Sequence, residues 1–267
     1  MIFESNLHLL FAALIGLVAG VVGGLAGIGG SLIMLPALGL IFGYDDPLRT
    51  EQHSYQAATM MVNLAVAIPA TWSHRRAGVF RKDLLAWVVP SMAVAIVAGV
   101  ACSNLLNGRA LQHVLAGLVA WDSTVNIYRL VRRVDETKLG PERAGRGLML
   151  LAGGSAGFAG GIAGLGGGVL VVPILQLLGR VPLKHAIATS SAAMCVSSAI
   201  GAAMKLGTLG EHGRTVRESV FLALLMAPGA IVGAMIGSTL THKLPVGVLR
   251  LLVSLILLTT AIKLAIG

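Results

Sequence analysis

The chain has 267 residues, of which 56% are hydrophobic and only 12% are charged. Soluble domains carry about 25% charged residues, so this composition excludes an ordinary soluble protein and indicates a membrane protein. The formal net charge of +9 does not indicate nucleic-acid binding, because the basic residues cluster in short segments at the ends of apolar runs.

Long uncharged runs predict the membrane-embedded helices. Residues 5–44, 147–179 and 185–204 contain no Asp, Glu, Lys or Arg, and a helix needs roughly 20 apolar residues to cross a bilayer. We therefore expect an all-α polytopic membrane protein. The expected helical segments are 7–27, 31–43, 55–73, 84–104, 110–130, 147–165, 168–179, 186–205, 217–240 and 246–265.

The first segment, 7–27, has glycines four residues apart, among them Gly20 and Gly24. This small-xxx-small pattern lets membrane helices approach closely, so we interpret these glycines as packing residues. The segments 31–43 and 168–179 are too short to cross about 30 Å of hydrocarbon at about 1.5 Å per residue. We expect both to be half-helices or the second legs of re-entrant hairpins.

A second group of small residues, Gly29, Gly30 and Ser31, lies where the first two segments meet. Each glycine costs about 1 kcal/mol relative to alanine in a helix, so the helix is expected to break here. Such breaks are tolerated in membranes mainly where they line a cavity. A helix beginning at Ser31 would direct free N–H groups and the positive end of its dipole into that cavity, which suits an anion.

The third and fifth segments add polar side chains. Thr59 and Asn63 in the third segment would complete the shell of a bound anion. A purely structural role for Thr59 stays open, because serine and threonine commonly bond back to their own helix. In the fifth segment Asp122 is the one acid in an apolar run. It is a candidate for proton coupling, with a solvated interfacial carboxylate as the alternative.

A basic stretch separates two similar halves. Residues 16–38 and 153–175 align without gaps and match at 11 of 23 positions. We therefore expect a first transmembrane repeat at 1–130, a cytoplasmic linker at 131–146 and a second transmembrane repeat at 147–267. Each repeat would hold about five helical segments, giving eight to ten in total.

The second repeat contains an equivalent glycine break and equivalent hydroxyl groups. The break consists of Gly166, Gly167 and Gly168, and Thr189 and Ser190 follow in the next segment. Backbone N–H groups from both breaks, with polar side chains from both repeats, predict a small, neutral, donor-rich anion site between the repeats.

The charge distribution does not decide how the repeats are oriented. The loop 74–82 and the linker are rich in Arg and Lys and are expected in the cytoplasm. The repeats are inverted if residues 7–43 form a hairpin and parallel if they cross once, and both arrangements place equal numbers of basic residues inside. The surplus length of 31–43 favours the inverted arrangement, which is common in transporters.

Motifs of enzymes and of nucleotide binding are absent from the sequence, which lacks H-E-x-x-H, G-x-S-x-G and G-K-[ST]. We expect no catalytic residue, metal or cofactor. Cys102 and Cys195 lie singly in apolar runs and are interpreted as packing residues. His74 and His185 lie at helix ends, where an interfacial position or a role in gating or proton transfer is compatible with the sequence.

Three motifs resemble those of a known family. GLAGIGGSLIMLP at 24–36 and GIAGLGGGVLVVP at 161–173, with ATSSAAM at 188–194, are similar to the TauE/SafE family of sulfite and organosulfur-anion permeases. The resemblance covers essentially the whole chain. The first repeat departs from the second, with AATMM at 57–61 and Ser31 in the position of Gly168, so its half of the site offers fewer hydroxyl groups.

The resemblance implies a multi-pass permease of the cytoplasmic (inner) membrane that moves sulfite or sulfonates. We expect it to work by alternating access around the site between the glycine breaks. Export is favoured, because an anion leaves an inside-negative cell with a gain of about 2.3 kcal/mol per charge per 100 mV. The expected partners are the lipid bilayer and the small anion, and a homodimer is compatible with the sequence. An anion channel and a non-transporting membrane-embedded subunit are the alternative functions.

Overall fold

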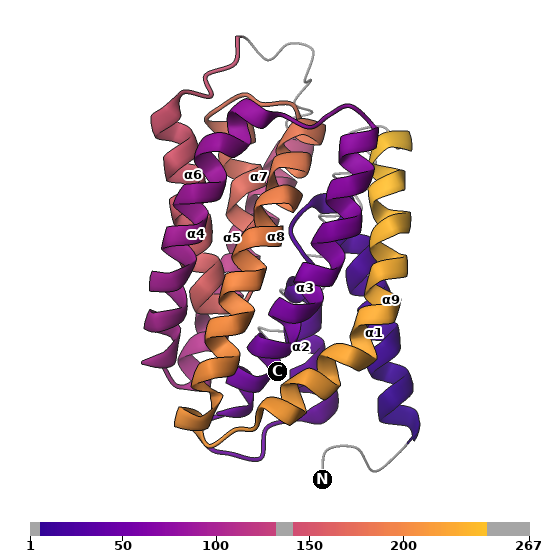
Figure 1. Ribbon diagram of the computed structural model, residues 1–267, viewed down its shortest axis with the longest axis vertical. Helices are drawn as coiled ribbons and strands as arrows, with labels where there is room; N and C mark the ends of the chain where they lie inside the picture. The colour runs from indigo at the N-terminus through magenta and orange to yellow at the C-terminus, as the bar shows by residue number, and fades with distance from the viewer. Residues whose placement is uncertain (1–5, 132–140, 245–267) are drawn as a thin grey trace.

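The computed structural model describes residues 6–131 and 141–244, and every regular element within these ranges is helical (Figure 1). The elements in chain order are α1 (Asn6–Ala26), α2 (Ser31–Phe42), α3 (Glu51–Arg76), α4 (Lys82–Asn104), α5 (Gly108–Val131), α6 (Arg146–Ala163), α7 (Gly168–Leu177), α8 (Leu183–Thr208), the short 3₁₀ helix η2 (Leu209–His212) and α9 (Val216–Lys243). The tenth expected segment, 246–265, and part of the linker, 132–140, lie outside the described residues.

Within the described ranges, the helices expected from the apolar runs are all present. The largest difference is at the start of α3, which begins at Glu51 and not at residue 55. Its first turn is polar but buried, because α9 packs on it and the Ser219 hydroxyl donates a hydrogen bond of 3.1 Å to the Ser54 carbonyl oxygen. Hydrophobicity alone therefore places the start of α3 too late.

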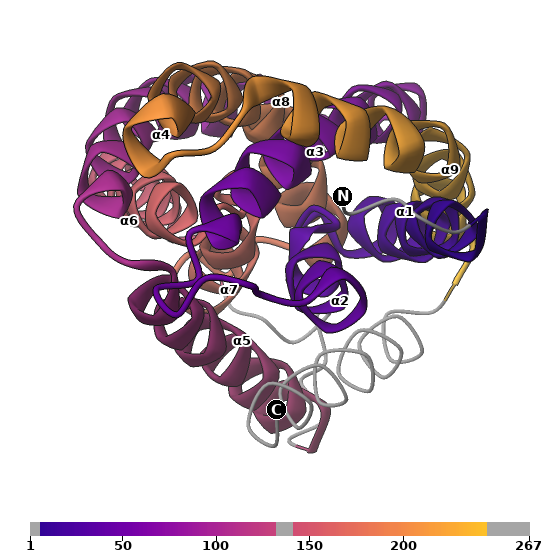
Figure 2. The same cartoon turned by 90° about the horizontal axis from the view of Figure 1, so that it is seen from below.

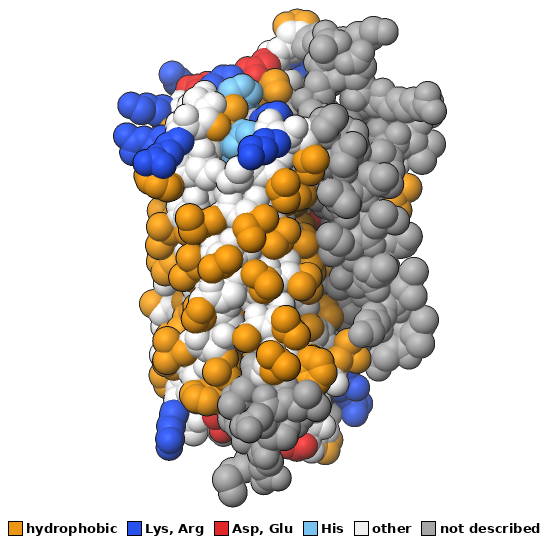
Figure 3. All heavy atoms as spheres, turned by 90° about the vertical axis from the view of Figure 1, so that its right-hand side faces the viewer, with side chains coloured by type: hydrophobic (Ala, Val, Ile, Leu, Met, Phe, Trp, Pro, Cys, Tyr) orange, Lys and Arg blue, Asp and Glu red, His pale blue; other side chains and the backbone are white. Residues whose placement is uncertain are grey.

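Among the described residues, three helices are long and apolar enough to cross a membrane: α4, α8 continued by η2, and α9. Large apolar side chains on these helices face outward, and Val94 and Leu224 are 75% and 65% exposed. On one side of the molecule, hydrophobic side chains cover the middle while Lys, Arg and His gather toward the ends (Figure 3). This distribution matches a hydrocarbon layer between two aqueous phases.

The two short helices each fold back against the preceding helix. In the second half, the start of α6 lies beside the end of α7, because the Arg143 N–H donates a 2.9 Å hydrogen bond to the Gly179 carbonyl oxygen. In the first half, a Cβ on Gly30 would lie 2.9 Å from the Ala19 Cβ, which places the start of α2 directly against α1. Each glycine segment, 27–30 and 164–167, is therefore the turn of a helical hairpin.

Each hairpin packs on a helix from the other half of the chain. α1 runs parallel to α9, since Gly16 faces Met226 and Gly24 faces Ala234. A Cβ at either glycine would lie 2.9 Å from the Cα of the residue opposite. The four-residue glycine spacing therefore serves close helix packing, as expected.

The same relationship joins α6 to α4, again in parallel. A Cβ on Gly157 would lie 2.5 Å from the Met92 carbonyl oxygen, and a Cβ on Gly161 would lie 2.8 Å from the Ile96 carbonyl oxygen. Seen from below, the α1–α9 pair and the α4–α6 pair form opposite sides of the molecule (Figure 2). The two halves are thus interlocked and do not form separate bodies.

The helices α3 and α8 cross the centre in opposite directions. The Thr71 hydroxyl lies 3.5 Å from Cys195 Sγ, and Lys205 Nζ lies 2.9 Å from His53 Nδ1, so residue numbers rise along one helix as they fall along the other. We call the two ends of the molecule the Glu51 end, where α3 begins, and the Arg76 end, where it finishes. The hairpin turns lie against the middle of these two helices.

Candidate functional site

One buried side chain on α3 ties the two glycine segments together. Asn63 Oδ1 accepts a hydrogen bond of 3.0 Å from the Gly30 N–H, and Nδ2 donates to Ser31 Oγ at 2.5 Å and to the Leu165 carbonyl oxygen at 3.1 Å. The side chain has no solvent exposure. Its acceptor and both of its donors are therefore used within the site.

The α8 hydroxyl groups make the reciprocal connection. Ser190 Oγ lies 2.6 Å from the Gly27 carbonyl oxygen and 3.1 Å from the Gly168 carbonyl oxygen. Ser197 Oγ donates to the Gly166 carbonyl oxygen at 2.5 Å. These hydroxyls bind carbonyl oxygens of the glycine segments and therefore do not use their N–H groups.

Two of the glycines are required by the geometry. Gly29 has φ +73° and Gly166 has φ +68°, a left-handed conformation that residues with a Cβ rarely adopt. A Cβ on Gly29 would lie 2.9 Å from Asn63 Oδ1, and one on Gly166 would collide with Ser198 Oγ. The close approach of polar side chains to the backbone depends on these two residues.

The site retains unused hydrogen-bond donors. Among the described residues, no backbone partner accepts from the N–H groups of Gly29, Gly166 or Gly167. The Ser198 hydroxyl, which is fully buried beside Gly166, has no partner either. The α2 and α7 helices begin directly after these segments, so their positive dipole ends add to the field. Buried, unpaired donors at two helix N-termini form an environment that favours an anion.

The other predicted site residues, Thr59, Thr189 and Asp122, do not link the two glycine segments as Asn63 and Ser190 do. Thr59 Oγ1 lies 3.4 Å from the Gly164 carbonyl oxygen and 3.1 Å from the carbonyl oxygen of its own Gln56, so it contacts the outer part of the hairpin turn. The Thr189 hydroxyl donates to the His185 carbonyl oxygen at 2.9 Å within α8. Asp122 is buried on α5, which packs against α3, α6 and α7.

The whole site is enclosed. Ser31, Thr59, Asn63, Thr189 and Ser190 all have 0% solvent exposure. The geometry therefore corresponds to a state in which neither end of the molecule opens to the glycine segments.

A buried lysine at the Glu51 end was not anticipated from the sequence. Lys205 Nζ lies 2.9 Å from His53 Nδ1 and 3.0 Å from Asn104 Oδ1, and the side chain has no solvent exposure. The His53 ring stacks on His212 at a centroid distance of 3.7 Å. A lysine that interrupts an otherwise apolar run was the available sequence signal.

At the Arg76 end, a second polar contact joins α3 to α9. His74 Nδ1 lies 2.9 Å from His242 Nε2, and His185 Nδ1 lies 2.8 Å from the Val79 carbonyl oxygen. Lys184 Nζ donates to the His242 carbonyl oxygen at 3.1 Å. His74 and His185 therefore lie at helix ends, as expected, and both contact a partner from the other half of the chain.

Comparisons with known proteins identify the relatives of this chain. The family described as sulfite exporter TauE/SafE matches residues 12–264. A probable membrane transporter protein MamO of Magnetospirillum gryphiswaldense is 27% identical over 97% of this chain and 45% of that protein. MamO of Paramagnetospirillum magneticum is 26% identical over 89% of this chain and 41% of that protein. The chain thus spans less than half the length of these two relatives.

A third relative has a similar length. The probable membrane transporter protein MJ0441 of Methanocaldococcus jannaschii is 25% identical over 96% of this chain and 94% of that protein. No solved structure matches the chain. The relatives that match nearly the whole chain are described as membrane transporters, which agrees with the apolar exterior of α4, α8 and α9.

Proposed function

Because this chain belongs to the sulfite exporter TauE/SafE family, we propose that it moves a small sulfur-containing anion, such as sulfite or a sulfonate, across the cytoplasmic membrane. Membership of this family and the descriptions of the relatives support a role as a membrane transporter. The substrate, the export direction and the site are our proposals.

The observation that carries the proposal is the set of unused donors around the two glycine segments. The N–H groups of Gly29, Gly166 and Gly167 have no backbone partner among the described residues, and the Ser198 hydroxyl has no partner there, although all four residues are buried. A buried unpaired donor costs about 1–3 kcal/mol. A bound oxyanion would satisfy several such donors at once, so the anion and the site would stabilise each other.

We infer that the two repeats, 1–130 and 147–267 around the linker, have inverted orientations. α1 runs from the Glu51 end and its counterpart α6 runs from the Arg76 end, and the counterparts α3 and α8 are antiparallel. The contact between Lys205 and His53 closes the Glu51 end, and that between His74 and His242 closes the Arg76 end. Alternate breaking of these two contacts would expose the site to each side in turn.

We place the Arg76 end in the cytoplasm. The Arg81 side chain of the loop 74–82 forms a 3.2 Å ion pair with Glu142, so this loop and the linker lie at the same end. Both segments are rich in basic residues, which supports a cytoplasmic position. Export would then release the anion at the Glu51 end, driven by the membrane potential. Uptake would need coupling, for which Asp122 is the candidate proton carrier.

The experiment that tests the proposal is counterflow of radiolabelled sulfite in proteoliposomes. Ser198→Ala is the most informative variant, because it removes a hydroxyl group that has no hydrogen-bond partner and so leaves the fold intact. The control is Ser155→Ala, which removes an exposed hydroxyl bonded within α6. We expect saturable counterflow that falls at least severalfold in Ser198→Ala and is unchanged in Ser155→Ala.

Each contrary result has a defined meaning. Sulfite flux without saturation or counterflow would mean that the protein is an anion channel and not a transporter. Full activity of Ser198→Ala would mean that the substrate does not bind at the glycine segments. If neither sulfite nor a panel of sulfonates is moved, the proposed substrate class is wrong.

A further inference from the structure

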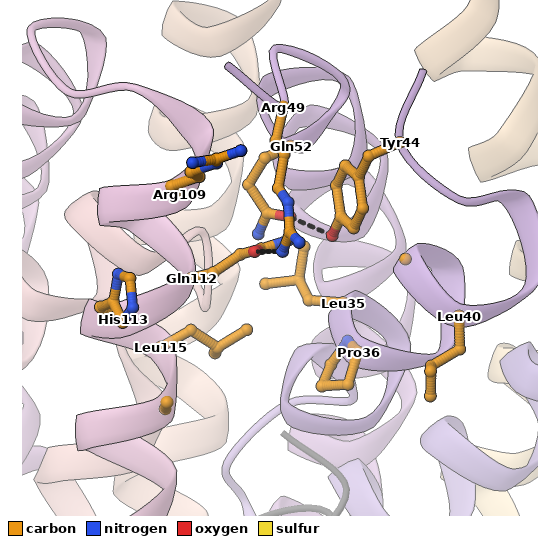
Figure 4. Close-up of a pocket in the computed structure, with 12 residues that line it drawn as sticks. Leu35, Pro36, Leu40, Tyr44, Arg49, Gln52, Arg109, Gln112, His113 and Leu115 are labelled. Carbon is orange, nitrogen blue, oxygen red and sulfur yellow. Dashed lines mark hydrogen bonds between the residues drawn. The ribbon is translucent and has the colours of Figure 1, made fainter. Parts of the chain in front are cut away.

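A separate cleft of about 440 Å³ opens at the Glu51 end between α2, the loop before α3 and the first turns of α5 (Figure 4). On one side Tyr44, Arg49 and Gln52 line it, and on the other Arg109, Gln112 and His113 face them from α5. Apolar side chains of α2 close the remaining wall. The cleft is thus polar and basic at its mouth and apolar along one side.

The positive charge in this cleft is not paired with an acidic residue of its described lining. None of the described lining residues is Asp or Glu. Arg49 Nη1 donates a hydrogen bond to Gln112 Oε1, and the guanidinium lies 5.0 Å from the centroid of the Tyr44 ring. Both partners, the Gln112 amide and the Tyr44 ring, are uncharged. A guanidinium carries five N–H donors. Most of the N–H donors of Arg49 therefore remain available for an anion. The exposed guanidinium of Arg109 is available as well.

A second, independent feature of the cleft is an unpaired amide. The Tyr44 hydroxyl donates a 2.8 Å hydrogen bond to Gln52 Oε1. Gln52 Nε2 is buried and has no hydrogen-bond partner in the described part of the chain. Burial raises the pKa of Tyr44 to about 12, so the phenol is protonated at neutral pH and can donate to the Gln52 oxygen. The amide nitrogen is therefore a donor that awaits an acceptor.

The loop that carries Arg49 is held in a strained conformation. Arg49 has φ +55°, which is rare for a residue with a side chain. The strain is maintained from both sides: the Gly108 N–H of α5 donates to the Leu48 carbonyl oxygen at 3.0 Å, and Asp46 Oδ2 accepts from the Thr50 hydroxyl at 2.7 Å. Backbone strain that its surroundings enforce is typical of functional sites.

We infer that this cleft is a second anion-binding site, distinct from the glycine segments, for an oxyanion that carries a short apolar group. Arg49 and Arg109 bind the oxyanion, Gln52 Nε2 completes its shell, and the apolar wall of α2 takes the carbon chain. An arginine side chain suits this role because its planar fork matches the spacing of two anionic oxygens.

The role of this site in the transport cycle rests on the proposed function. With the Glu51 end outside the cell, the cleft would hold an exported sulfonate just before release, or collect it for uptake. The site itself does not depend on that direction, because its charge and donors are properties of the cleft alone.

Equilibrium binding to the purified full-length protein in a neutral detergent tests the inference. The probe is ethanesulfonate, and ethanesulfonamide is its uncharged counterpart. We expect ethanesulfonate to bind, the amide not to bind, and both Arg49→Gln and Arg109→Gln to weaken binding about tenfold or more. Arg109→Gln guards against misfolding, because its exposed side chain takes part in none of the loop contacts. Arg217→Gln, an exposed arginine at the same end, is the matched control and should bind normally.

Asn63→Ala separates this inference from the proposed function. Ethanesulfonate binding that survives in Asn63→Ala and fails in Arg109→Gln establishes a binding site in the cleft that is independent of the glycine segments, whether or not sulfite transport is observed. Equal binding by wild type and both arginine variants would overturn the inference. The same holds if only phosphatidylglycerol in nanodiscs binds, because the cleft would then be a lipid headgroup site.

Discussion

The side-chain amide of Asn63 on α3 donates a 3.1 Å hydrogen bond to the carbonyl oxygen of Leu165, which lies 102 residues further along the chain. Together with its bonds to Gly30 and Ser31, this contact makes one side chain the link between two glycine segments from different halves. The site therefore exists only when both halves are folded against each other.

Asn63→Ala should lower the free energy of unfolding by about 1–3 kcal/mol, because it leaves the Gly30 N–H without its buried acceptor. Reversible unfolding in mixed micelles measures the change. Thr124→Ala is the control, since that exposed hydroxyl bonds only to the Ala120 carbonyl oxygen of its own helix. A loss no larger than that of the control would mean that Asn63 does not join the hairpins.

Much of this architecture could be predicted from the sequence, because it follows from local patterns. Apolar run length identifies the helices, and the glycines around Gly29 and Gly166 mark the hairpin turns, since positive φ and close contacts admit no side chain there. The four-residue spacing of Gly16, Gly20 and Gly24 likewise predicts close packing of α1 on another helix.

The partners of these elements could not be predicted, because nothing local encodes which distant helix fills a glycine groove. Pairing of α1 with α9, and the contact between Asn63 and Leu165, are of this kind. Thr189 and Ser190 are adjacent hydroxyl residues, yet the first bonds within its own helix and the second bonds to Gly27 and Gly168. Only the rotation of α8 about its axis distinguishes them.

Gly166→Ala should destabilise the protein for two separable reasons. Its φ of +68° is costly for alanine, and the new methyl group would collide with Ser198 Oγ. Adding Ser198→Ala removes the collision but not the backbone strain, so the double variant should recover part of the loss and keep a deficit of about 1–2 kcal/mol. Thermal unfolding of the two single variants and the double variant measures this. Strict additivity would show that the two residues do not touch.

Gly157 and Gly154 on α6 should respond in opposite ways to alanine. A Cβ on Gly157 would lie 2.5 Å from the Met92 carbonyl oxygen of α4, whereas nothing lies within 4 Å of a Cβ on Gly154. Gly157→Ala should therefore separate the two helices and destabilise the fold. Gly154→Ala should stabilise it by about 0.5–1 kcal/mol through the higher helix propensity of alanine. Similar unfolding temperatures for the two variants would argue against the α4–α6 contact.

The buried Lys205 should tolerate replacement better than loss of its partner. Lys205→Met fills the same space with an apolar chain, whereas His53→Leu keeps the amine buried with only Asn104 as a polar partner among the described residues. Removing one member of a buried polar pair typically costs more than replacing the group itself. We expect His53→Leu to unfold at a lower temperature than Lys205→Met, and the double variant to recover stability. The reverse order would show that Lys205 is stabilised by other groups.

The proposed orientation predicts which side of the membrane each end faces. Glu142 at the Arg76 end and Glu211 at the Glu51 end are both accessible positions suited to cysteine labelling. In a background with Cys102→Ala and Cys195→Ser, an impermeant maleimide added to intact cells should label Glu211→Cys and spare Glu142→Cys until the cells are opened.

The substitutions themselves should not disturb the fold. Arg81 keeps its hydrogen bonds to Asp83 when Glu142 is replaced, and exposed ion pairs contribute only about 0–1 kcal/mol. Labelling of Glu142→Cys alone would reverse the orientation and move the Arg49 cleft to the cytoplasmic side. Labelling of both from outside would place the two ends on one side, which is incompatible with α4 and α8 as membrane-spanning helices. The pattern therefore tests the helix directions and the position of the cleft in one experiment.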